Sequence, residues 1–166
     1  LTKPVATATS VMILVERGKL RLNDTVGKFI PYIDDPDAKR VTILQLLTHT
    51  SGYRPDFDLG EKWTGREGML AALKKEKLRN PPGTRFVYSD IGFIVLEEIL
   101  YRTAGSFAPS FFSEHIAAPL GVFSSGYLTL AYFRDSPIWG WVGNRPAEGV
   151  SKERKFDDNS PKNPIA

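Results

Sequence analysis

Cysteine is absent from this 166-residue sequence, which excludes disulfide bonds, thiol nucleophiles and cysteine-based zinc sites. The absence assigns no compartment, because exported proteins without disulfides exist. Histidine is scarce as well, and the two present, His49 and His115, lack the spacing of a metal site. No apolar run approaches the ~20 residues that span a bilayer, and no signal peptide is visible. The composition therefore implies no metal and no cofactor.

A strong excess of one charge is also lacking, since 22 basic residues face 19 acidic ones and leave a net charge of +3. Such a balance indicates no nucleic-acid partner. One basic cluster, formed by Lys74, Lys75, Lys77 and Arg79, follows an amphipathic stretch, and we interpret it as a solvated helix end rather than an anion contact. With 42% hydrophobic residues, the chain is an ordinary globular protein, either one domain or a large piece of a bigger one.

Helical patterns dominate. The first segment, Thr2–Arg17, is apolar nearly all round and is followed by Gly18, which predicts a helix buried on most sides and capped at that glycine. Because a buried helix is an unusual start, and the chain begins at Leu1 rather than Met, we expect further residues upstream. Other helices are predicted over Val26–Ile30, from the cap Thr42 to Leu47, from Thr64 through Leu73, from the cap Ser89 to Gly105, and from the cap Ser106 through Ile116.

The segments between these helices are predicted to be irregular or extended. Lys19–Asp24 alternates like a short strand, Asp34–Asp37 is typical of a surface loop, and Arg85–Tyr88 is predicted to be extended. On the helix after Ser89, the pattern places Glu97, Glu98 and Arg102 outside. Residues 1–147 then form the helical part of the chain, and the polar, aperiodic residues 148–166 form a loop or frayed tail.

Two segments carry candidate chemistry. A lysine on the first turn of a buried helix, as predicted for Lys3, is costly to desolvate, which would push its amine toward the neutral form that accepts a proton. Tyr88 lies at a junction from extended chain into helix, where a polar side chain can be held at a cavity edge. Each has an ordinary alternative: Lys3 as a solvated helix end, and Tyr88 as a core aromatic beside the N-cap Ser89.

A third segment, Leu46–Gly52, contains His49 and Ser51. Residues so close at a helix end do not normally face each other, and no partner carboxylate is indicated, so a Ser–His catalytic pair is rejected. We expect His49 to bond to the backbone at the helix terminus. His115 is predicted to be a surface or packing residue.

Taken in order, these segments resemble the serine β-lactamase and penicillin-binding-protein family, which includes class C β-lactamases, D,D-carboxypeptidases and related esterases. Leu1-Thr2-Lys3 is similar to the end of the family's Ser-x-x-Lys motif, Leu46–Gly52 (LLTHTSG) to a characteristic segment, and Tyr88-Ser89-Asp90 to its Tyr-x-Asn motif. Ile116–Gly121 resembles the stretch that follows. The likeness covers Leu1 to about Gly126.

The resemblance implies roles for three residues. Lys3 would be the active-site lysine and Tyr88 its partner in proton transfer, while Asp90 would occupy the position of the Asn that orients the lysine and contacts substrate. This Asp is a departure, because an ionised carboxylate would favour the charged ammonium. The nucleophilic serine would directly precede Leu1, and the family's third motif, Lys-Thr-Gly or His-x-Gly, is missing from the chain.

The implied fold is α+β in the family and mainly α as given: a helical subdomain and a central buried helix with the flanking strands largely missing. The implied function is that of a serine hydrolase fragment acting through an acyl-serine on a β-lactam, a D-Ala-D-Ala peptide or a small ester, so that the partner is a small-molecule or peptidoglycan-peptide substrate. The alternatives are a non-catalytic binding relative and an inactive truncated fragment. The resemblance also implies a periplasmic or otherwise exported protein.

Overall fold

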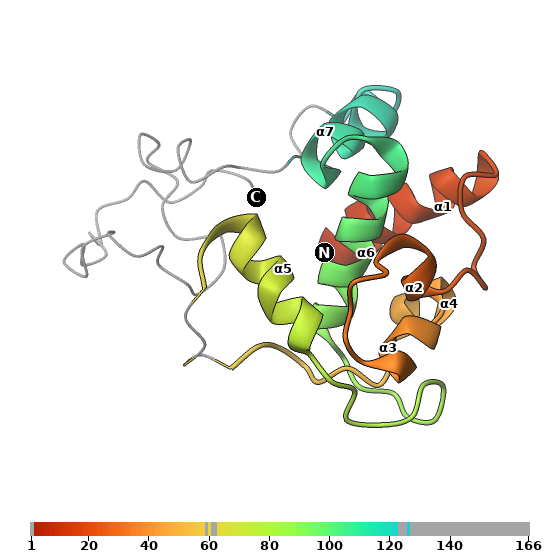
Figure 1. Ribbon diagram of the computed structural model, residues 1–166. Coiled ribbons are helices and arrows are strands. Elements are labelled where there is room, and N and C mark those ends of the chain that lie inside the picture. Colours follow the sequence, from red (N-terminus) through yellow and green to blue (C-terminus); the bar gives the residue numbers. More distant parts are fainter. Residues whose placement is uncertain (1, 59, 61–62, 123–125, 127–166) are drawn as a thin grey trace, which may run out of the picture. The chain divides into compact units, whose positions relative to one another are not determined.

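The helix that begins after Ser89 lies at the centre of the described fold. In the computed structural model, this helix, α6 (Asp90–Ala104), runs through the middle of the bundle (Figure 1). The elements packed against it are η1 (Lys3–Ala8), α1 (Thr9–Glu16), α2 (Val26–Phe29), α4 (Ile43–Leu47) and α7 (Ala108–Phe112). The remaining helices are α3 (Pro36–Arg40), α5 (Gly65–Lys75) and η2 (Ser113–Ala117). The two η segments are π-helical turns.

The structure describes residues 2–58, 60, 63–122 and 126, which belong to one compact unit running from Leu1 to Tyr127. Within these residues the secondary structure is helical, and strand pairing is limited to an isolated bridge between Thr25 and Thr42. This confirms the predicted helix-rich fold class. The predicted boundary at residues 147 and 148, and the predicted tail 148–166, lie outside the described residues.

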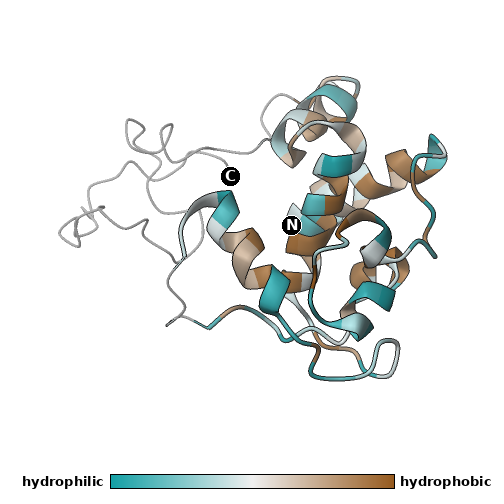
Figure 2. Cartoon of the chain, in the orientation of Figure 1, coloured by the Kyte–Doolittle hydropathy of each residue, from teal (hydrophilic) through white to brown (hydrophobic). Residues whose placement is uncertain are grey.

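The core forms where α6 meets α1, α2 and α4. Along α6 the side chains of Ile91, Val95, Leu96 and Ile99 are fully buried. Hydrophobic residues follow much of α6 and α1, whereas α3 is mainly hydrophilic (Figure 2). Among the described helices, none combines the length and the apolar character needed to cross a membrane.

Several helix ends lie where the capping residues in the sequence predicted them. Thr42 and Gln45 form a complete capping box at the start of α4. Ser89 caps α6 by accepting the N–H of Gly92, and Gly105 ends the same helix in the left-handed conformation with φ of 72°. The predicted caps at these positions are confirmed.

The first helix is less buried than its composition predicted. Ala6, Val11 and Leu14 face the core, but Val5 and Met12 are 50% and 46% exposed. The reason is that η1 and α1 pack against α6 and α7. The residues pointing away from those helices remain accessible.

Three predictions about the connecting segments were wrong. Lys19–Asp24 is a turn and not a strand: Leu20 is buried, and the neighbouring Leu22 carbonyl accepts the N–H of Leu44. The expected loop at Asp34–Asp37 contains the start of α3, because the Asp35 carboxylate accepts the N–H groups of Asp37 and Ala38. Helix α7 begins after Phe107, so Ser106 is not its cap.

Glu98, predicted to face outward, is buried with 3% exposure. Its carboxylate accepts hydrogen bonds from Arg66 of α5 at 2.7 and 2.8 Å and from Arg102 one turn along at 2.6 Å. A buried carboxylate is tolerated when it is paired and hydrogen-bonded in this way. The pair connects α5 to α6, and a helical periodicity cannot show such a partner.

Gly52 lies in close contact with the backbone of Asn80, and a substitution there tests that contact. It adopts φ of 90°, and a Cβ added there would lie 2.1 Å from the backbone oxygen of Asn80. We expect Gly52→Ala to destabilise the protein by about 3 kcal/mol or more. The alanine would have to adopt an unfavourable positive φ, and the backbone at Asn80 would also have to move away from the new Cβ. Gly105→Ala is the matched control, with φ of 72° and open space around it, and should cost only about 1 to 2 kcal/mol. Urea unfolding of both variants measures the difference, and equal losses would contradict the steric explanation.

Candidate active site

The site begins with Lys3, the first residue of η1. Its ammonium forms an ion pair with the Asp90 carboxylate. The Lys3 Nζ also lies 4.8 Å from the centroid of the Tyr88 ring and 5.7 Å from that of Phe93. The Lys3 side chain retains 24% exposure. The fold therefore brings together Lys3, Tyr88 and Asp90, which the sequence singled out from two distant segments.

Tyr88 and Asp90 flank Ser89, a buried serine whose hydroxyl is engaged in hydrogen bonds. The Ser89 hydroxyl donates to the carbonyl of Arg54 at 2.6 Å and accepts the N–H of Gly92 at 3.1 Å. The N–H of Asp90 donates to the carbonyl of Pro55 at 2.6 Å. Ser89 is fully buried, whereas Tyr88 is 57% exposed. The buried anchor thus leaves the two flanking side chains free to face Lys3.

The segment between α4 and the loop at Arg54 also contacts the chain around Ser89. His49 Nδ1 accepts the N–H of Ser89 at 3.0 Å, so His49 bonds to the backbone as expected, but at the start of α6 and not at the end of its own helix. Ser51 is buried, and its hydroxyl accepts the N–H of Tyr53 at 3.4 Å. The rejected Ser–His pair therefore has no support in the geometry.

The electrostatics of Lys3 differ from the prediction for a lysine on a buried helix. Burial lowers the pKa of Lys3, but its hydrogen bonds and charge interactions with Asp90 and Tyr88 raise it by more, so the net pKa lies above the ordinary value. The lysine is consequently held as an ammonium. Desolvation acts in the predicted direction and is the largest single effect, but the interactions with Asp90 and Tyr88 together outweigh it, as expected for an ionised Asp at position 90.

Glu97 is a neighbour that the sequence pattern missed. Predicted to face outward, it is half-buried where α6 meets η1, and Thr7 Oγ1 donates to Glu97 Oε1 at 3.3 Å. Burial raises the pKa of Glu97, although the Thr7 hydrogen bond and the charge of Lys3 oppose that shift. Thr7 lies one helical turn after Lys3, and residues one turn apart share a helix face. This spacing was the sequence signal that could have placed Thr7, and with it Glu97, near Lys3.

The other candidate residues have structural roles. His115 packs its ring edge-on against Phe111, with the centroids 4.4 Å apart, and its Nδ1 lies 3.5 Å from Arg17 Nη2. This confirms His115 as a packing residue. Within the described ranges, no group of three or more His, Asp or Glu side chains could hold a metal ion.

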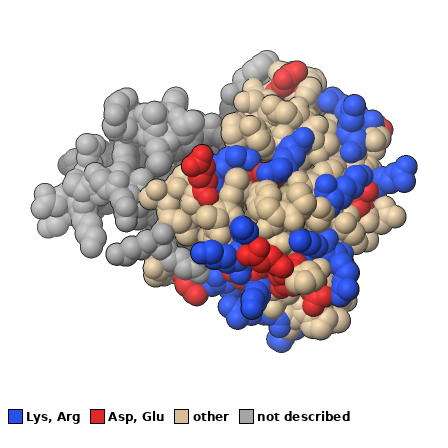
Figure 3. All heavy atoms as spheres, viewed as in Figure 1, with Lys and Arg blue, Asp and Glu red and all other residues tan. Residues whose placement is uncertain are grey.

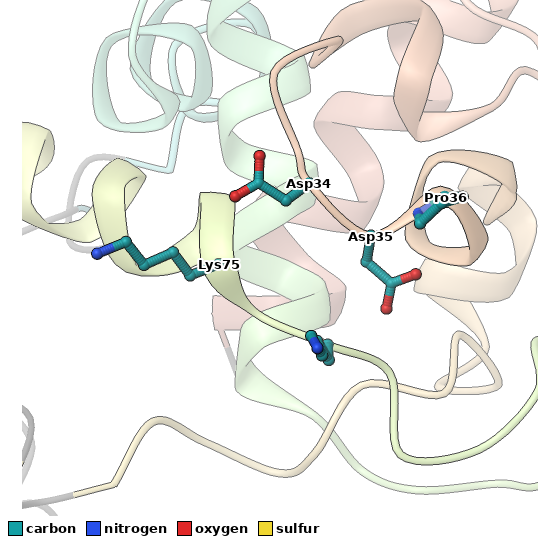
Figure 4. Close-up of a pocket in the computed structure, with 5 residues that line it drawn as sticks. Asp34, Asp35, Pro36 and Lys75 are labelled. Carbon is teal, nitrogen blue, oxygen red and sulfur yellow. The ribbon is translucent and has the colours of Figure 1, made fainter.

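The basic cluster at the end of α5 is exposed, as predicted. Two of its lysines, Lys75 and Lys77, line a hollow of about 420 Å³ together with Asp34, Asp35 and Pro36 (Figure 4). The Asp35 carboxylate is occupied by the N–H groups that start α3 and by that of Leu78. Acidic side chains also lie among the basic ones on the face shown in Figure 3. The cluster is therefore a mixed-charge surface and does not form an anion site.

Known proteins are similar to this chain in sequence and in fold. The family model described as Beta-lactamase matches residues 1–154. The D-alanyl-D-alanine-carboxypeptidase/endopeptidase AmpH of Escherichia coli K12 is 29% identical over 140 residues, covering 76% of this chain and 35% of AmpH. Penicillin-binding protein 4 of Amycolatopsis lactamdurans is 34% identical over 129 residues, covering 73% and 33%. The octameric penicillin-binding protein homologue from Pyrococcus abyssi has a TM-score of 0.65 at 29% identity, covering 81% and 33%. The chain thus spans about a third of the length of these relatives.

The Asp90 carboxylate is expected to control the protonation of Lys3. In an Asp90→Asn variant the charge is lost while burial remains, so the pKa of Lys3 should fall. In the native protein the raised pKa of Lys3 contributes stability that is present below its ordinary value of 10.5 and is lost as the pH rises through the folded value. NMR titration of the Lys3 Cε and Nζ resonances measures the shift. Asp37→Asn, which removes an exposed partner of Arg40, is the control, and an unchanged Lys3 titration in Asp90→Asn would refute the assignment.

Proposed function

Since the chain belongs to the Beta-lactamase family, we propose that it carries the proton-transfer part of a serine hydrolase active site. The observation that carries the proposal is the cluster in which the Lys3 ammonium contacts both Asp90 and Tyr88. These residues come from two segments 85 positions or more apart in sequence, and they share one partly exposed location. Chemistry of the acyl-transfer type requires such a set of titratable groups beside a nucleophile.

The nucleophile in this proposal is a serine three positions before Lys3, directly upstream of Leu1. Residues three apart on a helix lie on the same face, so its hydroxyl would project toward the Lys3 ammonium and the Tyr88 phenol. The serine oxygen attacks the substrate carbonyl and transfers its proton. The acyl-enzyme forms as the leaving group departs with a proton, and water then releases the acid and restores the serine.

The charge state of Lys3 assigns the proton to Tyr88. An ammonium paired with Asp90 has no lone pair with which to accept the serine proton. The phenol oxygen of Tyr88 is then the accepting group. It takes the serine proton as a phenolate and becomes a neutral phenol, and the Lys3 ammonium beside it stabilises the phenolate before the transfer. In this scheme Lys3 acts as a fixed positive charge, Tyr88 as the proton carrier, and Asp90 as the residue that keeps Lys3 charged and in place.

The proposed substrate is an ester or amide whose acyl group can be transferred to serine. A β-lactam, a D-Ala-D-Ala peptide and a small ester all meet this description, and two relatives are named as a D-alanyl-D-alanine carboxypeptidase and a penicillin-binding protein. A peptidoglycan-peptide substrate would place the protein outside the cytoplasmic membrane, so we propose an exported location.

A second candidate is a non-catalytic relative that binds such ligands without turnover. The carboxylate at position 90, where the family motif has Asn, favours it, because Asp90 engages the ammonium that the catalytic scheme needs beside the Tyr88 oxygen. The identity of the residue before Leu1 separates the two, since only a serine there supports acylation.

We expect the 166-residue chain to hydrolyse neither nitrocefin nor p-nitrophenyl esters, because acylation requires the upstream serine. The longer protein that contains this serine should be labelled by a fluorophosphonate. Lys3→Ala and Tyr88→Phe should each lower the labelling rate by roughly three orders of magnitude, because residues that act as a unit fail together. His115→Asn, whose contacts are with Phe111, Arg17 and Glu114, serves as the control. Turnover by the 166-residue chain that Lys3→Ala abolishes would place the nucleophile elsewhere, and a loss below about tenfold would count against the proposed role of Lys3.

A further inference from the structure

One residue, His49, is bonded to the chain on both sides of Tyr88. The carbonyl of His49 accepts the N–H of Val87 at 2.8 Å, and its Nδ1 accepts the N–H of Ser89 at 3.0 Å. Backbone hydrogen bonds on both flanks fix the path of the chain through Tyr88. Both depend on the same residue, which lies 39 positions earlier in the sequence, after α4.

The His49 ring also supports the Tyr88 side chain directly. The two ring centroids are 4.4 Å apart with a tilt of 32°, and the His49 ring further contacts Phe93 at 5.0 Å and Phe86 at 5.9 Å. Because Tyr88 is 57% exposed, the core does not surround its phenol. Its described ring contacts are the His49 imidazole on one element and the Lys3 ammonium on another.

The backbone of His49 is itself held in an unusual conformation. Its φ of 56° is in the left-handed region, and among the described non-glycine residues only His49 has a positive φ. Left-handed backbone persists at such a residue when the surroundings enforce it. Here it is the conformation in which both the carbonyl and Nδ1 of His49 reach the segment around Tyr88. Asparagine tolerates the same conformation and offers an acceptor at the position of Nδ1.

The hydrogen bond from Ser89 also sets the protonation state of His49. An Nδ1 that accepts an N–H carries a lone pair, so the ring proton of the neutral imidazole lies on Nε2. Protonation of Nδ1 would replace this acceptor with a donor facing a second donor. Burial and the charge of Lys3 lower the pKa of His49, while Asp90 opposes them. The neutral form is therefore favoured near pH 7.

We propose that His49 is a positioning residue for Tyr88, which holds the two flanking N–H groups and supports the phenol ring while its imidazole is neutral. The inference rests on the proposed function only in the role that it gives to Tyr88. His49 acts through Tyr88 and does not itself touch the substrate. Protonation of His49 Nδ1 removes the acceptor of the Ser89 N–H and so weakens the hold on Tyr88.

The tautomer of His49 can be measured in the native 166-residue chain. Long-range ¹H–¹⁵N correlation spectra of the labelled protein contain signals from two histidines, and a His115→Gln variant assigns them. We expect His49 to be neutral with its proton on Nε2 at pH 7.5, and to titrate below its ordinary value of 6.5. A proton on Nδ1, or a charged His49 ring at pH 7.5, would overturn the proposal.

Two substitutions separate the backbone contact from the ring contact. His49→Ala removes both, so the Ser89 amide shift and the ring shifts of Tyr88 should change together. His49→Asn keeps the acceptor, so the Ser89 amide should stay close to its native shift while the Tyr88 ring shifts still move. Unchanged Tyr88 resonances in both variants would refute the proposal. If His49→Ala fails to fold, His49→Asn and the native tautomer decide the question.

An activity measurement distinguishes this inference from the function on which it rests. In the longer protein with a serine before Leu1, His49→Ala should slow fluorophosphonate labelling on the order of 10²-fold, and His49→Asn should recover part of that loss. The native pH profile should fall on the acid side with the pKa measured for His49. Native protein that shows the expected NMR behaviour but no labelling would contradict the proposed function alone. Normal labelling of His49→Ala would contradict the positioning role alone.

Discussion

The whole site depends on the buried hydrogen bonds of Ser89. Its hydroxyl joins the loop at Arg54 to the start of α6, and its N–H joins the same point to His49. A buried polar group is stable only when its hydrogen bonds are made, so this residue fixes three segments of the chain relative to one another. Tyr88 and Asp90 are adjacent to Ser89 and inherit that fixed position. Precision at the partly exposed site thus comes from a residue that contributes no chemistry of its own.

Helix α6 supplies a second constraint through the charge of its first turn. Asp90 is the first residue of this 15-residue helix, where the partial positive charge of the helix N-terminus favours a carboxylate. The same carboxylate pairs with Lys3 at the start of η1. The pair therefore links the beginnings of two packed helices, and its geometry depends on how η1 lies against α6.

The sequence predicted those features that depend on neighbours along the chain. Thr42, Ser89 and Gly105 were assigned correctly because a cap is decided by residues within a few positions. The cluster of Lys3, Tyr88 and Asp90 was found through its resemblance to family motifs, since no periodicity links residues so far apart. Glu98 was misplaced because its partner Arg66 lies 32 residues away on another helix. The left-handed conformation of His49 was likewise invisible, because it is enforced by contacts with residues 87 and 89.

The charge of Lys3 shows why a motif alone does not determine a mechanism. Burial by itself would favour the neutral amine, and an amide at position 90 would not oppose that tendency. A carboxylate at position 90 reverses it, so the lysine stays cationic although its position in the fold is the expected one. Glu97 and Thr7, one turn further along the same interface, add a carboxyl whose pKa burial has raised. Because burial opposes a negative charge on Glu97, Asp90 is the carboxylate that sets the charge of Lys3, and through it the stability of a phenolate at Tyr88.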